Sequence, residues 1–143
     1  MKFLLLICFF LQAKVTGQVQ VAVEGVRLGM TAEAVIEKLG KDYDLVDTIG
    51  KSVAEGDHFY LLYRKKQGDV AVFFRFGRVW TVTGYRFTKG SDAVLSKGDN
   101  LQKMFKVLGK PRDAGPGQYL YRCDQVRILI ETENGKVTTV TLE

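Results

Sequence analysis

Two stretches of the chain, about seventy residues apart, follow the same order of glycine, polar and apolar residues. The first reads VRLGMTAEAVIEKLGK over residues 26–41, and the second reads LSKGDNLQKMFKVLGK over residues 95–110. Superposed without a gap, they align Gly29 with Gly98, and their later apolar positions coincide. Because this spacing exceeds the usual period of solenoid repeats, we interpret the pattern as a duplicated unit rather than an array.

Each stretch predicts a short helix. Thr31 in the first copy and Asn100 in the second are residues that cap helix N-termini well. Gly40 and Gly109 follow the apolar positions, where a glycine ends a helix at the lowest backbone cost. Such helices have about two and a half turns and are unstable alone in water. We therefore expect each of them to pack on a sheet.

Most of the remaining chain consists of runs rich in β-branched and aromatic residues, separated by turns that contain glycine. Such runs predict antiparallel strands connected as meanders. Strands are expected over residues 18–25, 59–66, 70–75, 79–87, 118–122, 126–132 and 136–142. Turns are expected at residues 67–69, 76–78 and 133–135. The last contains Asn134-Gly135, the strongest hairpin signal in the chain.

Three segments have a less regular pattern. Residues 41–57 suit either a strand or an irregular packed loop, residues 89–96 suit a short linker, and residues 113–117 suit a loop. With these segments between the regular elements, the sequence predicts an α+β fold. It consists of two tandem units, residues 18–88 and 89–143, each a helix plus an antiparallel β-meander. The short helices pack on one face of the sheet.

The N-terminus has the pattern of a secretory signal peptide over residues 1–17. Lys2 provides a basic start, residues 3–11 form an unbroken apolar run, and residues 15–17 are small or moderate in size. A buried N-terminal strand or helix is the alternative interpretation. No later segment is long and apolar enough to cross a bilayer. We therefore expect an extracytoplasmic protein, periplasmic or secreted.

The charge of the chain is mildly basic. The formal net charge is +5, and removal of Lys2 and Lys14 with the signal peptide would leave 5 − 2 = +3. The basic residues are scattered rather than clustered, so nucleic acid is not expected as a partner. Anionic surfaces or acidic proteins are more natural partners. Cys8 lies in the apolar run, which leaves Cys123 as the single mature thiol, and a small buried apolar role is expected for it.

Few features of the sequence indicate an enzyme. His58 is the only histidine, and it follows Glu55 and Asp57 in an expected loop without a serine or cysteine motif to activate. We interpret it as a solvated loop histidine. The acidic pairs suit solvated loops and strand edges, and the glycines stand at helix ends and turns rather than in phosphate-binding loops. No catalytic residue, metal site or cofactor is therefore expected.

Aromatic and arginine residues alternate along the expected strands and could share one sheet face. If the helices cover one face, the other would have the composition of a protein-binding hot spot. The alternative is that the aromatic residues form the core and the arginines lie at its rim. The candidate partner-binding residues are Tyr60, Arg64, Phe73, Arg75, Trp80, Arg86, Arg122 and Arg127.

The combination of a glycine, a polar cap, a short apolar helix ending in LGK and a following meander resembles the beta-lactamase inhibitor protein fold. It is also similar to the SmpA/OmlA (BamE-like) outer-membrane assembly lipoproteins. The matching stretches are residues 28–41 with 59–87 and residues 98–111 with 119–142. The resemblance implies helices on one face of the sheets and a protein-binding face on the other. The lipobox of the lipoproteins and the disulfide of some such domains are missing.

These observations lead to an ordered set of expectations about function. The first is a non-enzymatic module that binds a protein outside the cytoplasm, through the exposed sheet face and the segment over residues 41–57. The second is a protein that binds a small ligand or an envelope polymer between sheet and helices. A hydrolase that uses His58 comes third.

Overall fold

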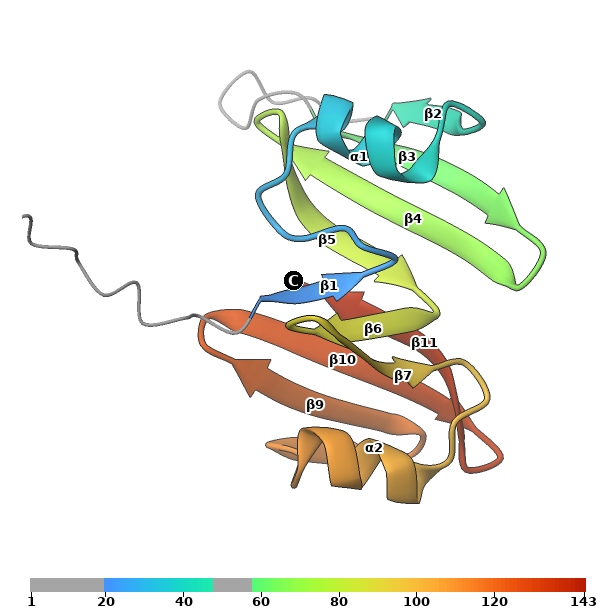
Figure 1. The fold of residues 1–143 in the computed structure, drawn as a ribbon, viewed down its shortest axis with the longest axis vertical. Coiled ribbons are helices and arrows are strands. Elements are labelled where there is room, and N and C mark those ends of the chain that lie inside the picture. The colour runs from blue at the N-terminus through green and yellow to red at the C-terminus, as the bar shows by residue number, and fades with distance from the viewer. Residues whose placement is uncertain (1–19, 48–57) are drawn as a thin grey trace, which may run out of the picture.

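The computed structural model describes residues 20–47 and 58–143, which form two antiparallel sheets and two helices (Figure 1). The predicted signal peptide lies outside the described residues. The large sheet has eight strands, in the order β2 (Asp44–Asp47), β3 (His58–Lys65), β4 (Gly68–Arg75), β5 (Arg78–Gly84), β11 (Lys136–Leu142), β10 (Val126–Glu133), β9 (Gln118–Cys123) and β8 (Asp113–Gly115). The small sheet has the order β1 (Val21–Val23), β6 (Arg86–Lys89) and β7 (Asp92–Ser96). The helices are α1 (Ala32–Leu39) and α2 (Leu101–Leu108).

The predicted α+β class is wrong. Among the described residues, 57% lie in strands and 14% in helices, so the fold is a β-rich arrangement of two sheets. The prediction overestimated the helices because their glycine boundaries are easy to recognise, whereas each helix has only eight residues. In addition, the uncertain segments contain strands β2, β7 and β8, which extend the sheets beyond the predicted meanders.

Both helices begin and end where the sequence predicts. Thr31 and Asn100 have extended backbones, and their side-chain oxygens accept hydrogen bonds from the amide three residues later, at 3.3 Å and 2.9 Å. Gly40 and Gly109 end the helices with positive φ angles of 96° and 77°. A side chain would strain the backbone there, which explains why glycine occupies both positions.

The large sheet is internally symmetric about its central pair of strands. Thr83 of β5 pairs with Thr141 of β11, and their hydroxyl oxygens are 2.9 Å apart. Hairpins β4–β5 and β10–β11 have a register shift at the same place, near the end of the first strand. Their turns also share a left-handed backbone at both central residues, which are Phe76-Gly77 and Asn134-Gly135. Positions that differ by 141 − 83 = 58 in number are therefore equivalent in the two halves of the sheet.

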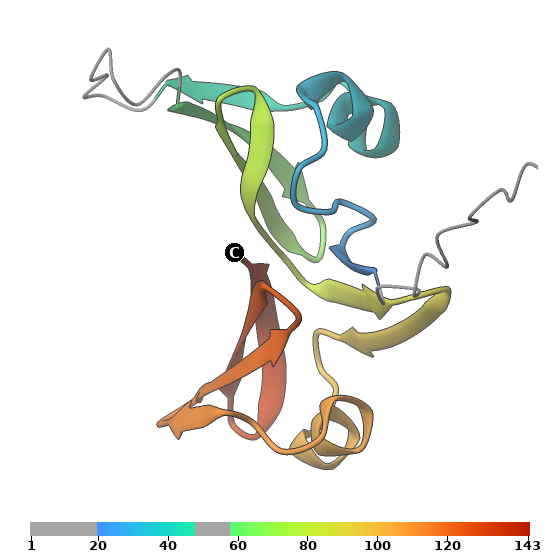
Figure 2. The same ribbon diagram turned by 90° about the vertical axis from the view of Figure 1, so that its left-hand side faces the viewer.

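One face of the large sheet is buried against the helices and the small sheet, which lie together on the same side (Figure 2). Alternate residues of β3 and β4 point into this core, as the period of a strand requires. The largest buried side chains come from every layer and include Tyr63, Phe74 and Ile130 of the large sheet, Phe87 and Leu95 of the small sheet, and Val35 and Met104 of the helices.

A tyrosine hydroxyl attaches each helix end to the large sheet. Tyr63 donates a hydrogen bond to the carbonyl oxygen of Gly40 at 3.0 Å, and Tyr121 donates one to that of Gly109 at 3.1 Å. The two tyrosines are equivalent, since 121 − 63 = 58. Burial raises the pKa of both hydroxyls above the usual value of 10.0, so they remain protonated donors at neutral pH.

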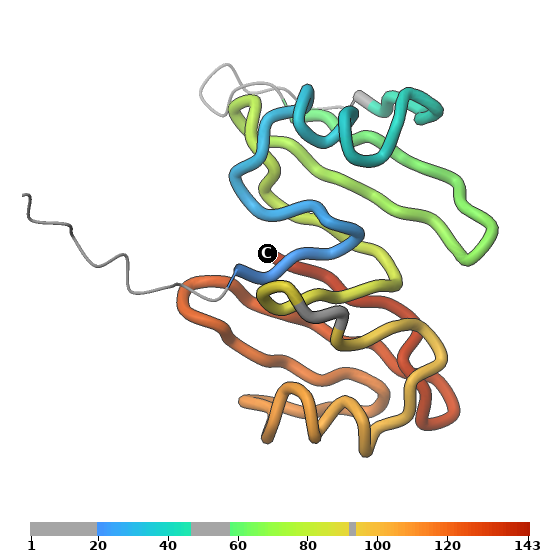
Figure 3. The backbone as a smooth tube through the Cα atoms, viewed as in Figure 1, coloured from blue at the N-terminus to red at the C-terminus, as the bar shows by residue number. Residues whose placement is uncertain are grey.

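The strand predicted over residues 79–87 is divided between the two sheets. The chain leaves the large sheet at Gly84 and enters the small one at Arg86. There β6 pairs with β1, which precedes it by more than sixty residues in the sequence (Figure 3). The linker predicted over residues 89–96 is also wrong, because β7 pairs with β6 there. A sequence cannot show that a short polar segment is a strand when its hydrogen-bonding partner lies elsewhere.

Candidate binding face of the large sheet

We call the face of the large sheet that points away from the helices and the small sheet the open face. Neighbouring residues of β3 and β4, such as Leu61 and Val72, are buried on the opposite side, so strand alternation identifies its members. It includes the predicted residues Tyr60, Arg64, Phe73, Arg75, Trp80, Arg122 and Arg127, together with Leu62, Leu120 and Leu129. Arg86 was wrongly placed with them, because it belongs to β6 of the small sheet.

A β-bulge turns Trp80 outward. Phe74 pairs with Val79 while Phe73 pairs with Thr81, which leaves Trp80 without a partner in the ladder. Such a bulge changes the direction of a side chain. The indole is 54% exposed, which is unusual for the largest apolar side chain in a protein.

Arg75 lies between two aromatic rings. Its guanidinium carbon is 5.0 Å from the centre of the Trp80 ring and 5.4 Å from that of Phe76. Both separations lie within the range of a favourable cation–π contact. Phe76 is 61% exposed, so both rings that contact the guanidinium reach solvent.

His58 and Phe73 complete what we call the aromatic cluster, which consists of His58, Phe73, Arg75, Phe76 and Trp80. The imidazole packs edge-on against Phe73 at 5.7 Å and against Phe76 at 6.5 Å, measured between ring centres. The prediction of a solvated loop histidine is therefore wrong, because His58 is the first residue of β3 and half-buried. Its pairing with Arg75 across the two strands brings it to the cluster.

The arginines of the open face differ in their surroundings. Arg64 pairs with Asp44 at 3.2 Å, Arg127 pairs with Glu143 at 3.1 Å, and Arg122 donates to a backbone carbonyl oxygen. Arg75 instead has a buried Nε that makes no hydrogen bond to any described residue. A buried donor without a partner has a substantial free-energy cost, which makes Arg75 the exceptional member of the group.

The equivalent positions in the second half of the sheet are polar. Glu133, Asn134 and Thr138 stand where the first half has Arg75, Phe76 and Trp80. The hydroxyl of Thr138 donates a hydrogen bond within the sheet, to the carbonyl oxygen of Glu131 at 3.0 Å. The same backbone thus carries an aromatic, cationic surface in one half and a polar surface in the other.

The sequence missed two members of the aromatic cluster, Phe76 and His58. One signal was present for Phe76, because an aromatic residue replaces the Asn or Asp that this type of turn favours. The predicted contribution of residues 41–57 is described in part: β2 occupies Asp44–Asp47, and residues 48–57 lie outside the described part of the chain. Cys123 is half-buried and packs against the core, close to its expected role.

The part of the chain that the structure describes contains no group of three or more His, Cys, Asp or Glu side chains placed to hold a metal ion. Nor do residues 20–47 and 58–143 include a helix with the length and apolar character needed to span a membrane. Comparisons of the chain with protein-family models, with curated proteins and with solved structures gave no match.

Proposed function

We propose that the chain is a non-enzymatic protein-binding module that acts outside the cytoplasm and binds its partner through the open face of the large sheet. The observation that carries this proposal is the aromatic cluster, in which the Arg75 guanidinium makes cation–π contacts with the exposed rings of both Phe76 and Trp80. Tryptophan and arginine are the residues most often responsible for binding energy at protein interfaces.

The geometry of the cluster suits tight binding because its side chains are already ordered. Ordering a flexible side chain on binding costs about 0.5–1.5 kcal/mol. Cation–π contacts with two rings restrict Arg75 before a partner arrives, and packing against Phe73 restricts His58 in the same way. A partner therefore meets a surface that needs little rearrangement.

The charge of the cluster suggests what the partner presents to it. Arg75 contributes a positive charge beside the exposed rings of Phe76 and Trp80. A partner with an aspartate or glutamate next to an apolar side chain would supply both an acceptor and a contact for the rings. The mild positive charge of the whole chain favours the same acidic class of protein partner.

The proposed compartment rests on the N-terminal sequence. The apolar run over residues 3–11 is what a secretory signal requires, and cleavage after Gly17 would release the chain outside the cytoplasm. The resemblance to the beta-lactamase inhibitor protein and SmpA/OmlA folds implies the same kind of role. Recovery of the protein from the medium or periplasm with its N-terminus at Gln18 would support the compartment, and recovery with Met1 intact would contradict it.

The first prediction concerns Trp80. An extracytoplasmic extract is passed over the immobilised mature chain, the captured protein is identified and purified, and its Kd is measured by calorimetry. We expect Trp80→Ala to weaken this binary affinity at least about tenfold, equivalent to 1.4 kcal/mol, because a hot-spot side chain is lost. Arg75→Ala should have a similar effect.

The matched control is Phe105→Ala, which removes an exposed aromatic side chain from α2 on the opposite side of the sheet. We expect its Kd to remain within about twofold of the unmodified chain. Circular dichroism and thermal unfolding establish that each variant is folded. An unchanged Kd for both Trp80→Ala and Arg75→Ala would overturn the assignment of the face, and failure to obtain any protein that binds as a purified pair would overturn the function.

A further inference from the structure

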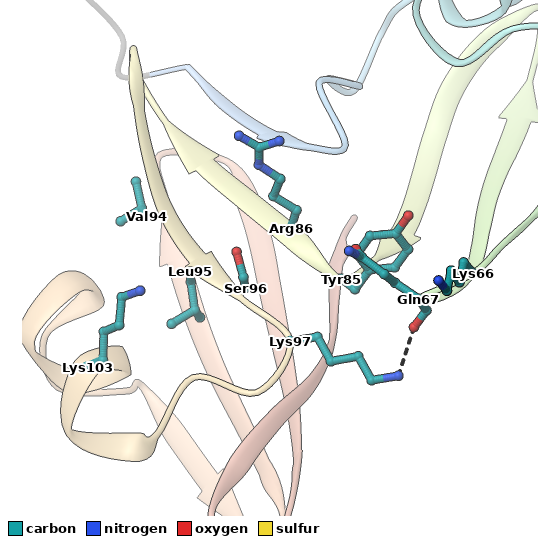
Figure 4. Close-up of a pocket in the computed structure, with 9 residues that line it drawn as sticks. All are labelled: Lys66, Gln67, Tyr85, Arg86, Val94, Leu95, Ser96, Lys97 and Lys103. Carbon is teal, nitrogen blue, oxygen red and sulfur yellow. Dashed lines mark hydrogen bonds between the residues drawn. The ribbon is translucent and has the colours of Figure 1, made fainter.

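A cavity of about 700 Å³ lies outside the aromatic cluster, between the β3–β4 turn, the small sheet and α2 (Figure 4). It is lined by Lys66, Gln67, Tyr85, Arg86, Val94, Leu95, Ser96, Lys97 and Lys103. This volume falls in the range of small-molecule binding sites. We call it the basic cavity, because its charged lining residues are Lys66, Arg86, Lys97 and Lys103.

The basic residues come from different parts of the chain. Lys66 lies in the β3–β4 turn, Arg86 begins β6, and Lys103 lies on α2. Lys97 follows β7 and reaches across to the turn, where its Nζ donates to the carbonyl oxygen of Gln67 at 2.8 Å (Figure 4). The tertiary structure therefore assembles a positively charged site that no run of the sequence contains.

Two carboxylates stand beside these cations, although neither lines the cavity. Asp99 forms an ion pair with Lys103 at 2.9 Å, and Glu24 interacts electrostatically with Arg86. Partial burial tends to raise the pKa of Asp99, but hydrogen bonds from Lys103 and the Ser96 amide, with the charge of Lys103, lower it overall. Four cations and two carboxylates leave 4 − 2 = +2 at this place.

A second cavity, of about 710 Å³, occupies the equivalent place in the other half of the molecule. Asp124 and Gln125 form its turn, at the positions of Lys66 and Gln67, since 124 − 66 = 58. The aligned helix stretches place further members of its lining in the same way. Leu28 corresponds to Lys97 and Ala34 to Lys103.

The comparison shows that the cavity belongs to the symmetry of the fold, whereas these lysines belong to one copy; the cations that line the second cavity are Arg27 and Arg78, at other positions. At three corresponding positions, the basic cavity has lysine where the second cavity has an acidic, a leucine and an alanine side chain. Like charges brought together repel each other, so this lining has an electrostatic cost that an anion would remove. The fold itself does not require these lysines, because the second cavity forms without them.

We propose that the basic cavity binds a small molecule that carries several phosphate groups. The site offers ammonium and guanidinium donors, which favour phosphate oxygens, and hydroxyls of Tyr85 and Ser96 that can add hydrogen bonds. Because the cations are distributed over several elements, a ligand with more than one phosphate can contact more of them than a single ion can. The site shares no residue with the aromatic cluster, so this function is separate from protein binding.

The second prediction uses myo-inositol hexakisphosphate as the probe and the second cavity as the source of substitutions. A triple variant, Lys66→Asp, Lys97→Leu and Lys103→Ala, copies the residues of the equivalent cavity, so the fold should tolerate it. Calorimetry with the whole mature chain at an ionic strength of about 0.15 M should show binding that the triple variant weakens at least about tenfold, since several charge contacts are lost.

A control with the same change in charge tests whether a local site is responsible. Three substitutions at exposed positions outside the cavity, Lys110→Asp, Lys89→Ala and Arg112→Ala, together remove the same total charge. We expect this control to lose less than about threefold, because distant surface charges are largely screened. Equal losses in the two triple variants would overturn the proposal, as would absence of probe binding to the unmodified chain.

Asp99→Asn is expected to increase affinity for the probe, which loss of structure would not do. Asparagine keeps an oxygen that can accept from the Ser96 amide, now 2.7 Å from the Asp99 carboxylate, but it releases Lys103 from its ion pair. Affinity for the probe should therefore rise about two- to fivefold, as expected from the modest strength of an exposed pair. A decrease would contradict the role of Lys103.

The same variants distinguish a soluble phosphate compound from a lipid headgroup. Vesicles of phosphatidylcholine alone and with phosphatidylglycerol are compared by cosedimentation. If the soluble probe binds and anionic vesicles do not, the source is a soluble molecule. If anionic vesicles also bind, and the triple variant weakens that binding to the same extent, the phosphate of a lipid headgroup is a source. If the triple variant leaves vesicle binding unchanged, the vesicles bind outside the cavity.

Discussion

At the scale of the residue, Gly84 ends β5 of the large sheet where the chain packs closely against Val23 of β1 and the following Glu24. A Cβ atom there would lie 2.8 Å from Cγ1 of Val23 and 2.9 Å from Cγ of Glu24, closer than real Cβ contacts allow. The reason for glycine at this position is therefore steric. Its backbone φ is not in the left-handed region, unlike that of the helix-ending Gly40 and Gly109.

The third prediction follows from this contact. Gly84→Ala should lower the free energy of unfolding by about 1–3 kcal/mol, because the added methyl group must displace packed atoms of β1 and its turn. Urea denaturation measures the change. Gly115→Ala is the matched control, since β8 is exposed and no atom lies within 4 Å of the added carbon. Equal stability of Gly84→Ala and the unmodified chain would show that the sheets separate easily.

At the scale of the element, the helices depend on the large sheet for their position. Each is only eight residues long. The carbonyl oxygen of the glycine that follows each helix accepts a hydrogen bond from the hydroxyl of Tyr63 or Tyr121. The sequence predicted the caps correctly, because a cap depends on residues three or four positions apart. It did not predict the tyrosine contacts, because they join residues from different elements.

The fourth prediction concerns these two hydroxyls. Tyr63→Phe and Tyr121→Phe should each lower the free energy of unfolding by about 1 kcal/mol, since the ring remains and one hydrogen bond is lost. Their effects should add in the double variant, because they act in opposite halves of the sheet. Tyr119→Phe, whose hydroxyl makes no hydrogen bond within the described chain, should leave urea denaturation unchanged. An equal change in all three variants would contradict the assigned role.

At the scale of the whole molecule, Glu24 joins the sheets at the corner between β5 and β6. Its amide donates to the carbonyl oxygen of Arg86 at 3.0 Å, and its carboxylate accepts from the amide of Tyr85 at 3.2 Å. Burial raises the pKa of this carboxyl above 4.5, even though hydrogen bonds to the carboxylate from the backbone amides of Tyr85 and Arg86, and the charges of Arg86 and Lys65, act in the opposite direction. The charged form is thus disfavoured in the folded protein.

The fifth prediction is the pH dependence that results. The folded protein binds this proton more tightly than the unfolded chain, so the contribution of Glu24 to stability is greatest below the unfolded pKa and is lost as pH rises through the folded pKa. Glu24→Gln keeps an acceptor for Tyr85 without the charge. Relative to the unmodified chain, this variant should gain stability between pH 4 and pH 7 in urea denaturation. A relative loss over that interval would show that attraction to Arg86 dominates.

The candidate face and the basic cavity show how far the sequence could lead. Alternation grouped Tyr60 with Arg64 on β3 and Phe73 with Arg75 on β4, because side chains two apart share a face, and the structure places both pairs on the open face. It could not reveal that a bulge exposes Trp80, or that Arg86 passes to the small sheet and joins the lysines. Both outcomes depend on pairing between strands rather than on periodicity within one.

The sequence by itself determined the local elements: the helix caps, the glycine ends, the tight turns and the main hairpins. These follow from interactions among residues a few positions apart, which the order of amino acids states directly. The tertiary structure alone decided that β5 and β11 join both halves into one sheet, that the three uncertain segments contain strands β2, β7 and β8, and which face is open. Those features depend on hydrogen bonds and buried contacts between distant residues, so only the folded chain reveals them.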